Sequence, residues 1–249
     1  FFLVPMLWFV ATGAVASFAT HQALRRTFAL RRSLSPRQSD IAAHSAVCLA
    51  HNVAAAAAAA YITPLRALLL DGDARWHDIL PGFAPLAGMS AGFFLFDLAT
   101  IRHWVVFSPL MVAHHAVAAF CWTMSASVGF AQPWIGYCML TELSSTFLSS
   151  RTLLTAIGDT RSAAYRAVSV AFLLSFLAVR TVPIPLLART WLREPPIGTA
   201  ACGPLRAAQW MGWMSALPLL LNAFWTVGIT RKALAELRAA LATNARTAD

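Results

Sequence analysis

The sequence predicts an all-α, polytopic membrane protein with about seven transmembrane helices. The first observation is composition: 59% of the residues are hydrophobic, 12% are charged, and the mean hydropathy is +0.64. A soluble domain of 249 residues cannot bury that much apolar surface. The second observation is spacing, because roughly 20 apolar residues form a helix that crosses a bilayer. The chain contains seven such stretches, and the connections between them are short.

The stretches divide the chain into three parts. Residues 1–39 are an N-terminal transmembrane anchor with a basic loop, 40–233 hold the other six helices as one domain, and 234–249 are a basic C-terminal tail. The segments expected to span the membrane are 1–24, 40–65, 82–101, 108–128, 131–153, 163–187 and 207–230.

Local signals set some of the boundaries. Ser39 and Asp40 predict the N-terminus of the second helix. The small side chains of Ala54–Ala60 permit close contact with a neighbouring helix. Pro183 and Pro185 are expected to bend or end the sixth helix.

The net charge of +9 is distributed unevenly. With seven spans, 13 of the 19 Lys and Arg residues fall on the face that carries the first loop and the C-terminus, which we call the basic face. Such a bias predicts a cytosolic or matrix location for that face, and basic residues there attract anionic lipids. We expect the endoplasmic reticulum membrane, with the mitochondrial inner membrane or another organelle as the alternative. No nucleic-acid partner is predicted.

Seven ionisable side chains lie at least one turn inside the predicted spans. They are His44, His51, Asp97, His114, His115, Glu142 and Arg180. Charge at bilayer depth costs ~3 kcal/mol or more per group, so such side chains face an interior, pair with one another and mark functional sites. Asp97 descends towards the basic face and His114 rises from it, so both are expected at a similar depth.

Short motifs follow one another between residues 40 and 233. They are Ser45…His51, GFFLFD (92–97), His114-His115, ELSSTFL (142–148), Arg151 with Leu153-Leu154, Phe172…Phe176…Arg180, and LNAFW (221–225) before Arg231-Lys232. In order and spacing these motifs resemble the TLC-domain family, which includes ceramide synthases and translocation-associated membrane proteins. The resemblance implies six helices arranged as a barrel around a cavity, with a peripheral first helix.

The resemblance also implies a chemistry. In ceramide synthases the cavity holds a long acyl chain, and paired histidines with downstream aspartates serve acyl transfer from acyl-CoA. Those synthases have a His-Asp…Ser-Asp stretch in the helix after the paired histidines, whereas this chain reads ELSSTFL from Glu142. The departure favours a branch with an ELST-like motif over a ceramide synthase.

We therefore predict a protein that binds or acyl-modifies a long-chain lipid or acyl-CoA inside the membrane. A histidine oriented by a carboxylate is a suitable base for acyl transfer, with acyl-CoA as co-substrate. The predicted catalytic residues are His114, His115, Asp97 and Glu142. The residues predicted to bind the ligand are His51, Ser145, Arg180, Asn222 and Trp225.

Several alternatives stay open on the sequence alone. The polar residues could bind a lipid headgroup or acyl-CoA without chemistry, or could only hold helices together. The chain could also be a non-catalytic subunit that contacts other membrane protein subunits and structural lipids. No metal site is predicted, because no HxxxH or HExxH pair occurs on one helix.

Overall fold

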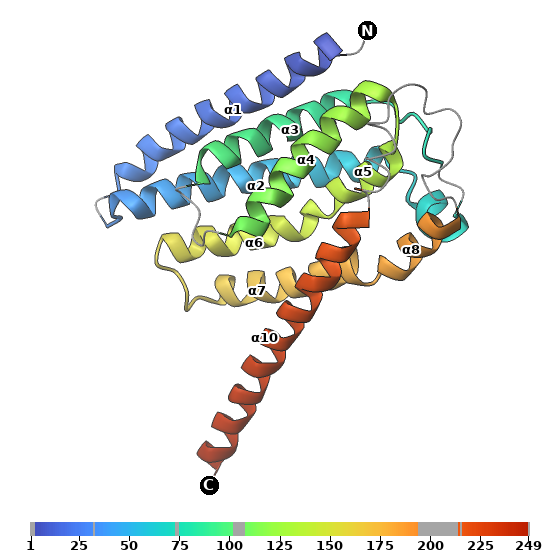
Figure 1. Cartoon of the computed structure of the whole chain (residues 1–249). Helices are drawn as coiled ribbons and strands as arrows, with labels where there is room; N and C mark the ends of the chain where they lie inside the picture. Colours follow the sequence, from blue (N-terminus) through green and yellow to red (C-terminus); the bar gives the residue numbers. More distant parts are fainter. Residues whose placement is uncertain are drawn as a thin grey trace.

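The chain folds into a bundle of helices (Figure 1). The computed structural model describes residues 3–31, 33–72, 75–101, 108–193, 214 and 216–248, and this part of the chain contains no strand. The predicted all-α class is therefore confirmed. The helices are α1 (Leu3–Ala29), α2 (Pro36–Ile62), α3 (Phe83–Ala99), α4 (Pro109–Val128), α5 (Gln132–Leu140), α6 (Glu142–Ala156), α7 (Ala163–Phe176), α8 (Ile184–Arg193) and α10 (Ala216–Ala248), with π-helical turns η1 (Ala67–Asp71) and η3 (Leu177–Thr181).

Within the described residues, three helical stretches are long and apolar enough to cross a membrane. They are Val4–Ala29, Pro36–Ile62 and the continuous unit Ala163–Arg193, while α3 is a shorter apolar helix. The protein is therefore an integral membrane protein. The number of seven spans and the barrel arrangement stay predictions.

The helices pack in a continuous series. α4 contacts α3, α3 contacts α1, α1 contacts α2, α2 contacts α6, and α6 contacts α7. α1 lies at the edge of the bundle beside α2 and α3 (Figure 1). α10 contacts η3 and α8, and its C-terminal half projects away from the bundle (Figure 1).

The second helix begins one turn earlier than its sequence predicted. Ser35 is the N-cap: its hydroxyl accepts from the backbone N–H of Gln38, and its own N–H donates to the Gln38 side chain. This reciprocal pair satisfies two N–H groups at the helix end, and Pro36 in the first turn needs no acceptor. The prediction at Ser39 and Asp40 was wrong because it overlooked this stronger capping box.

The sixth helical segment passes its prolines and reaches Arg193. Pro183 has no N–H to donate to the carbonyl of Val179 four residues before it. The hydroxyl of Tyr137 donates to that carbonyl instead, at 2.7 Å. The π-helical turn η3 therefore absorbs the bend without ending the helix.

The predicted fifth and seventh segments differ from the structure in other ways. The fifth is divided at Thr141 into α5 and α6. The predicted start of the seventh at 207 lies outside the described residues. From Ala216 the helix α10 continues to Ala248, so the segment 234–248, expected as a tail, is helical.

The contact between α1 and α3 is close enough to require glycine. A Cβ at Gly92 would overlap the carbonyl oxygen of Val10, and a Cβ at Gly13 would overlap that of Met89. Two small residues that face each other across a helix pair let the backbones approach, as in other membrane helices. These glycines therefore fix α1 against the helix that carries Asp97.

Gly92→Leu is expected to destabilise the fold, because the new side chain must push α1 away from α3. Overpacking of this kind costs about 1–3 kcal/mol, which exceeds the gain of roughly 0.5–1 kcal/mol from removing a helical glycine. Thermal unfolding in detergent should show a lower Tm. Gly228→Leu is the matched control, since a Cβ at Gly228 meets nothing within 4 Å. Equal Tm values for the two variants would contradict the close contact.

Candidate functional site

A buried carboxylate on α3 joins histidines from two other helices. Asp97 is 3% exposed. Its Oδ1 lies 2.6 Å from Nε2 of His44 on α2, and its Oδ2 lies 2.6 Å from Nδ1 of His115 on α4. Both carboxylate oxygens are thus occupied by imidazole nitrogens. The sequence predicted a similar depth for Asp97 and His114, and in the structure it is the adjacent His115 that contacts Asp97.

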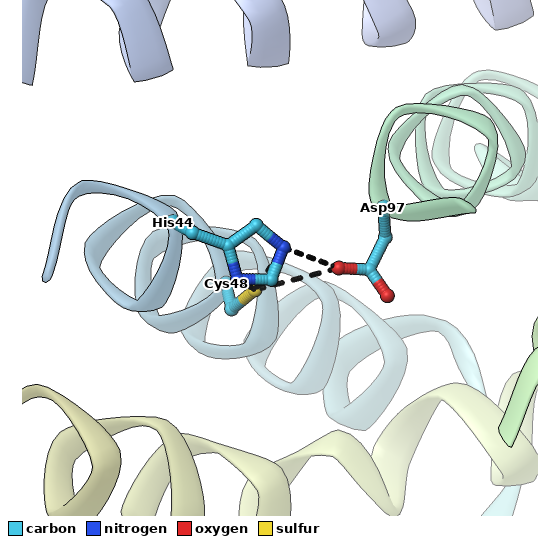
Figure 2. A group of neighbouring side chains, drawn as sticks. All are labelled: His44, Cys48 and Asp97. Atoms are coloured by element: carbon cyan, nitrogen blue, oxygen red, sulfur yellow. Dashed lines mark hydrogen bonds and ion pairs between the residues drawn. The ribbon is translucent and has the colours of Figure 1, made fainter. Parts of the chain in front are cut away.

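Cys48 lies beside this group, one turn after His44 on α2 (Figure 2). These side chains are of types that can bind a metal ion, and the possible ligand atoms of His44, Cys48 and Asp97 all lie within 4.8 Å of one another. Two ligands of a tetrahedral zinc ion with bonds of ~2.0–2.3 Å are more than ~3 Å apart. The 2.6 Å between His44 and Asp97 is instead a hydrogen-bond distance. The geometry is that of hydrogen-bonded side chains.

The two adjacent histidines of α4 have different surroundings. Successive residues of a helix point ~100° apart, and the ring centroids of His114 and His115 are 5.5 Å from each other. His115 meets Asp97, whereas the ring of His114 lies edge-on against Trp225 of α10, with centroids 5.4 Å apart. The two histidines therefore cannot perform the same function.

Arg180 is the centre of a second polar group. Its Nε donates to Ser144 at 2.8 Å, Nη1 donates to Asn222 at 3.3 Å, and Nη2 donates to Ser145 at 3.1 Å. Nη2 also donates to the backbone carbonyl of Thr141 at 3.1 Å, and it lies 3.9 Å from a carboxylate oxygen of Glu142. Arg180 is only 8% exposed, so its charge is stabilised by these groups from α6 and α10.

A cavity adjoins both polar groups; we call it the polar cavity. Its volume is about 310 Å³. Its polar lining includes Asp97, His114, His115, Glu142, Ser145 and Arg180, and its apolar lining includes Phe93, Phe94, Leu148, Phe172, Phe176 and Ile229. A cavity with convergent polar groups on apolar walls is typical of a ligand site.

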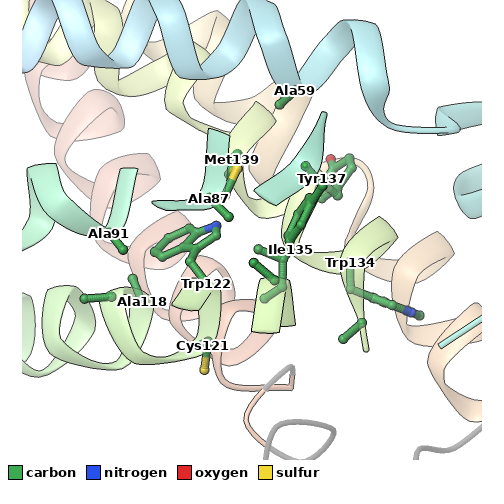
Figure 3. Close-up of a cluster of buried hydrophobic side chains, with 14 of the residues drawn as sticks. Ala59, Ala87, Ala91, Ala118, Cys121, Trp122, Trp134, Ile135, Tyr137 and Met139 are labelled. Atoms are coloured by element: carbon green, nitrogen blue, oxygen red, sulfur yellow. The ribbon is translucent and has the colours of Figure 1, made fainter. Parts of the chain in front are cut away.

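The second cavity, which we call the apolar cavity, is smaller, at about 60 Å³. It lies against the buried core of α3, α4 and α5 (Figure 3), and Trp122, Trp134, Ile135, Leu187 and Leu221 line it. Four residues line both cavities: His114, Glu142, Arg180 and Trp225. The two cavities therefore meet at this set of mostly polar side chains.

One predicted site residue lies apart from the others. The ring of His51 stacks on Phe93, with centroids 3.7 Å apart and planes 7° from parallel, and its Nδ1 lies 3.3 Å from the side-chain oxygen of Asn52. His51 is not among the residues that line the polar cavity. Its neighbour Asn52 does line it and donates to Ser149 at 3.0 Å.

Comparison with known families explains the order of the motifs. A family model described as TLC domain, of the TRAM_LAG1_CLN8 type, matches residues 42–231. The chain belongs to the TLC-domain family. Membership of this family makes it a lipid-related membrane protein. No curated protein and no solved structure matches the chain. Assignment to a branch with an ELST-like motif stays a prediction.

The matched TLC domain contains every residue of the two polar groups, but it begins after α1. Sequence reasoning predicted Asp97 and His115 as catalytic residues and Ser145, Arg180 and Asn222 as ligand-binding residues, and the structure places each of them in one of the two polar groups. It named His44 among the buried ionisable side chains without assigning it to the site, and it missed Cys48 and Ser144. The spacing of His44 and Cys48, four residues apart on one helix face, was the available signal. Nothing in the sequence distinguishes Ser144 from the adjacent Ser145.

Proposed function

We propose that this TLC-domain protein binds a long-chain acyl lipid or acyl-CoA in the polar cavity and transfers the acyl group, with His115 as general base. The observation that carries the proposal is the contact between Asp97 and Nδ1 of His115 at the wall of the cavity. A carboxylate that accepts from Nδ1–H leaves Nε2 without a proton, and Nε2 is then the atom that can take one. This is the arrangement that general-base catalysis requires.

The cavity walls support a ligand with both a polar and an apolar part. The reacting carbonyl would lie near His114, Glu142 and Arg180, where the two cavities meet. The acyl chain would contact the apolar linings, for example Phe172, Ile229 and Leu221. In the reaction, His115 takes the proton of an amine or hydroxyl as that group attacks the thioester carbon, and it returns this proton to the sulfur as the C–S bond breaks, so that the CoA thiol leaves. An amine that enters as an ammonium ion first loses one further proton to His115, and that proton must leave the site.

The guanidinium of Arg180 is better suited to polarise the carbonyl of the acyl ligand than to bind a free anion. Four hydrogen bonds from its guanidinium already go to protein acceptors, and the carboxylate of Glu142 lies within 4 Å. The remaining capacity of such a group is a single donor, which can polarise a carbonyl oxygen as charge develops on it. Ser145 and Asn222 hold the guanidinium in place in this proposal.

Mass spectrometry of the lipids that remain with the gently purified protein tests the proposal. We expect one dominant long-chain acyl species in the wild-type protein and its loss from the His114→Ala/His115→Ala double variant, because both side chains line the cavity. His77→Ala is the matched control, since His77 is exposed in the connection before α3. Bulk membrane lipid in equal amounts from all three proteins would instead favour a structural role or a subunit of a larger complex.

A further inference from the structure

The strongest feature that the proposed function does not use is a buried histidine on α1. His21 is 2% exposed, and its ring lies edge-on to the ring of His44, with centroids 6.4 Å apart. α1 lies outside the matched TLC domain. An imidazole buried beside His44, which itself contacts Asp97, is a polar group at bilayer depth, and such groups mark functional sites. A buried histidine at position 21 therefore needs a functional explanation.

The antiparallel pairing of α1 and α2 places ionisable residues at successive levels. Arg25 forms an ion pair with Asp40, and one helical turn further inside, His21 faces His44. The side chains of Arg25 and Asp40 are 46% and 19% exposed, so this pair is the surface end of the series. It lies beside the loop that joins α1 to α2, on the basic face.

The series continues to the polar cavity without a break in ionisable groups. His44 contacts Asp97, Asp97 contacts His115, and His115 lines the cavity. The surroundings are apolar: Phe96 is fully buried and packs against both His21 and His44, with Phe18 on its other side. Residues from α1, α2, α3 and α4 thus form one line of side chains from the basic face to the cavity.

We propose that His21, His44, Asp97 and His115 form a proton relay that connects the polar cavity with the basic face. An imidazole can take a proton on one ring nitrogen and release another from the second nitrogen, which makes it suited to such a path. The contacts between His44, Asp97 and His115 are hydrogen-bond distances. The gap between His44 and His21 is one that a ring rotation or a single water molecule can bridge.

The transfer balances in protons and charge. In the resting site, one proton is shared between Asp97 and His44. When Nε2 of His115 takes a proton in the cavity, its Nδ1 proton passes to Oδ2 of Asp97. The shared proton completes its transfer from Oδ1 to Nε2 of His44. His44 then releases the proton on Nδ1, which lies 3.8 Å from Sγ of Cys48, and this proton reaches His21 by ring rotation or through a water molecule. The net change is one proton moved from the cavity to His21.

The relay rests on the proposed function for the origin of its proton. An acyl chain in the cavity excludes water from His115, and a base that has taken a proton from an ammonium group must lose it before the next cycle. The existence of the path can be measured without any turnover, so the two proposals fail separately.

The measurement is the exchange of imidazole protons with water, followed by NMR on ¹⁵N-histidine-labelled protein in phosphatidylcholine nanodiscs loaded with palmitic acid. We expect the ring protons of His44 and His115 to exchange at least tenfold more slowly in His21→Phe than in the wild type. Phe18→Leu is the control, because Phe18 also packs on Phe96 but carries no proton. Where His21→Phe does not fold, His21→Gln replaces it, since an amide preserves polarity but does not titrate.

Exchange rates that stay within twofold of wild type in a folded His21 variant would overturn the relay, because protons would then reach His44 from the cavity. A slowed exchange in a protein that transfers no acyl group would keep the relay and reject the proposed reaction. Acyl transfer together with unchanged exchange rates would keep the proposed reaction and reject the relay.

Discussion

Asp97→Asn is expected to lower the rate of the proposed acyl transfer by roughly 10²–10⁴-fold, the usual contribution of a general base. The asparagine side chain fills the same volume, but one of its two polar atoms is a donor where the carboxylate has only acceptors. Oδ2 of Asp97 lies 2.6 Å from Nδ1 of His115, and in the proposed mechanism this contact keeps Nε2 free of a proton. An amide group facing the two histidines forces one of them into the opposite tautomer.

The rate is measured as release of the CoA thiol from palmitoyl-CoA in proteoliposomes. Asp71→Asn is the matched control, because Asp71 is the last residue of η1 and forms an exposed ion pair with Arg66. We expect the control to keep the wild-type rate and His115→Ala to lose activity as Asp97→Asn does. If Asp97→Asn and His115→Ala both fail to insert and fold, the group holds helices together and the base mechanism loses its support.

The apolar segments could be predicted from the sequence because hydropathy is a property of each residue and its near neighbours. The predicted second, third and fourth segments correspond to α2, α3 and α4. Helix boundaries were harder to predict where two local signals competed. Ser35 with Gln38 forms a better cap than Ser39, and the orphaned carbonyl of Val179 is satisfied by Tyr137, a residue 42 positions away. Such a distant partner leaves no local signal.

The membership of the site could be predicted, but its pairing could not. Depth in the membrane placed Asp97 level with the histidines of α4, and this estimate needed only the length of each segment. The choice between His114 and His115 depends on the rotation of α4 about its axis, since neighbouring residues point ~100° apart. The same applies to α2, where His44 meets Asp97 while His51 stacks on Phe93. Rotation is set by packing between helices.

The second group illustrates the same limit. Sequence reasoning predicted that Arg180 pairs with other ionisable side chains inside the spans. The structure supplies mostly neutral acceptors, among them Ser144 and Asn222, with Glu142 at 3.9 Å. The bend at η3 turns the guanidinium towards α6, and the sequence contains no direct indication of that direction.

Arg180→Met is expected to cost about 3–5 kcal/mol of unfolding free energy, the range for removing one member of a buried charged pair. Methionine preserves much of the volume but leaves the carboxylate of Glu142 without its cation. The substitution also removes the guanidinium N–H groups that donate to Ser144, Ser145, Asn222 and the carbonyl of Thr141. Arg189→Met makes the same chemical change at an exposed position of α8 and is expected to stay within about 0.5 kcal/mol of wild type.

Reversible unfolding of the purified protein in mixed detergent micelles measures these differences. The double variant Arg180→Met/Glu142→Gln should recover part of the lost stability, because it no longer buries an unpaired carboxylate. Recovery would show that the charge of Glu142 in the folded protein is compensated by Arg180 despite their separation of 3.9 Å. If Arg180→Met is as stable as Arg189→Met, the guanidinium does not hold α6, η3 and α10 together. Its hydrogen bonds would then be replaceable, and a ligand oxygen in the polar cavity would become the better explanation for a buried arginine.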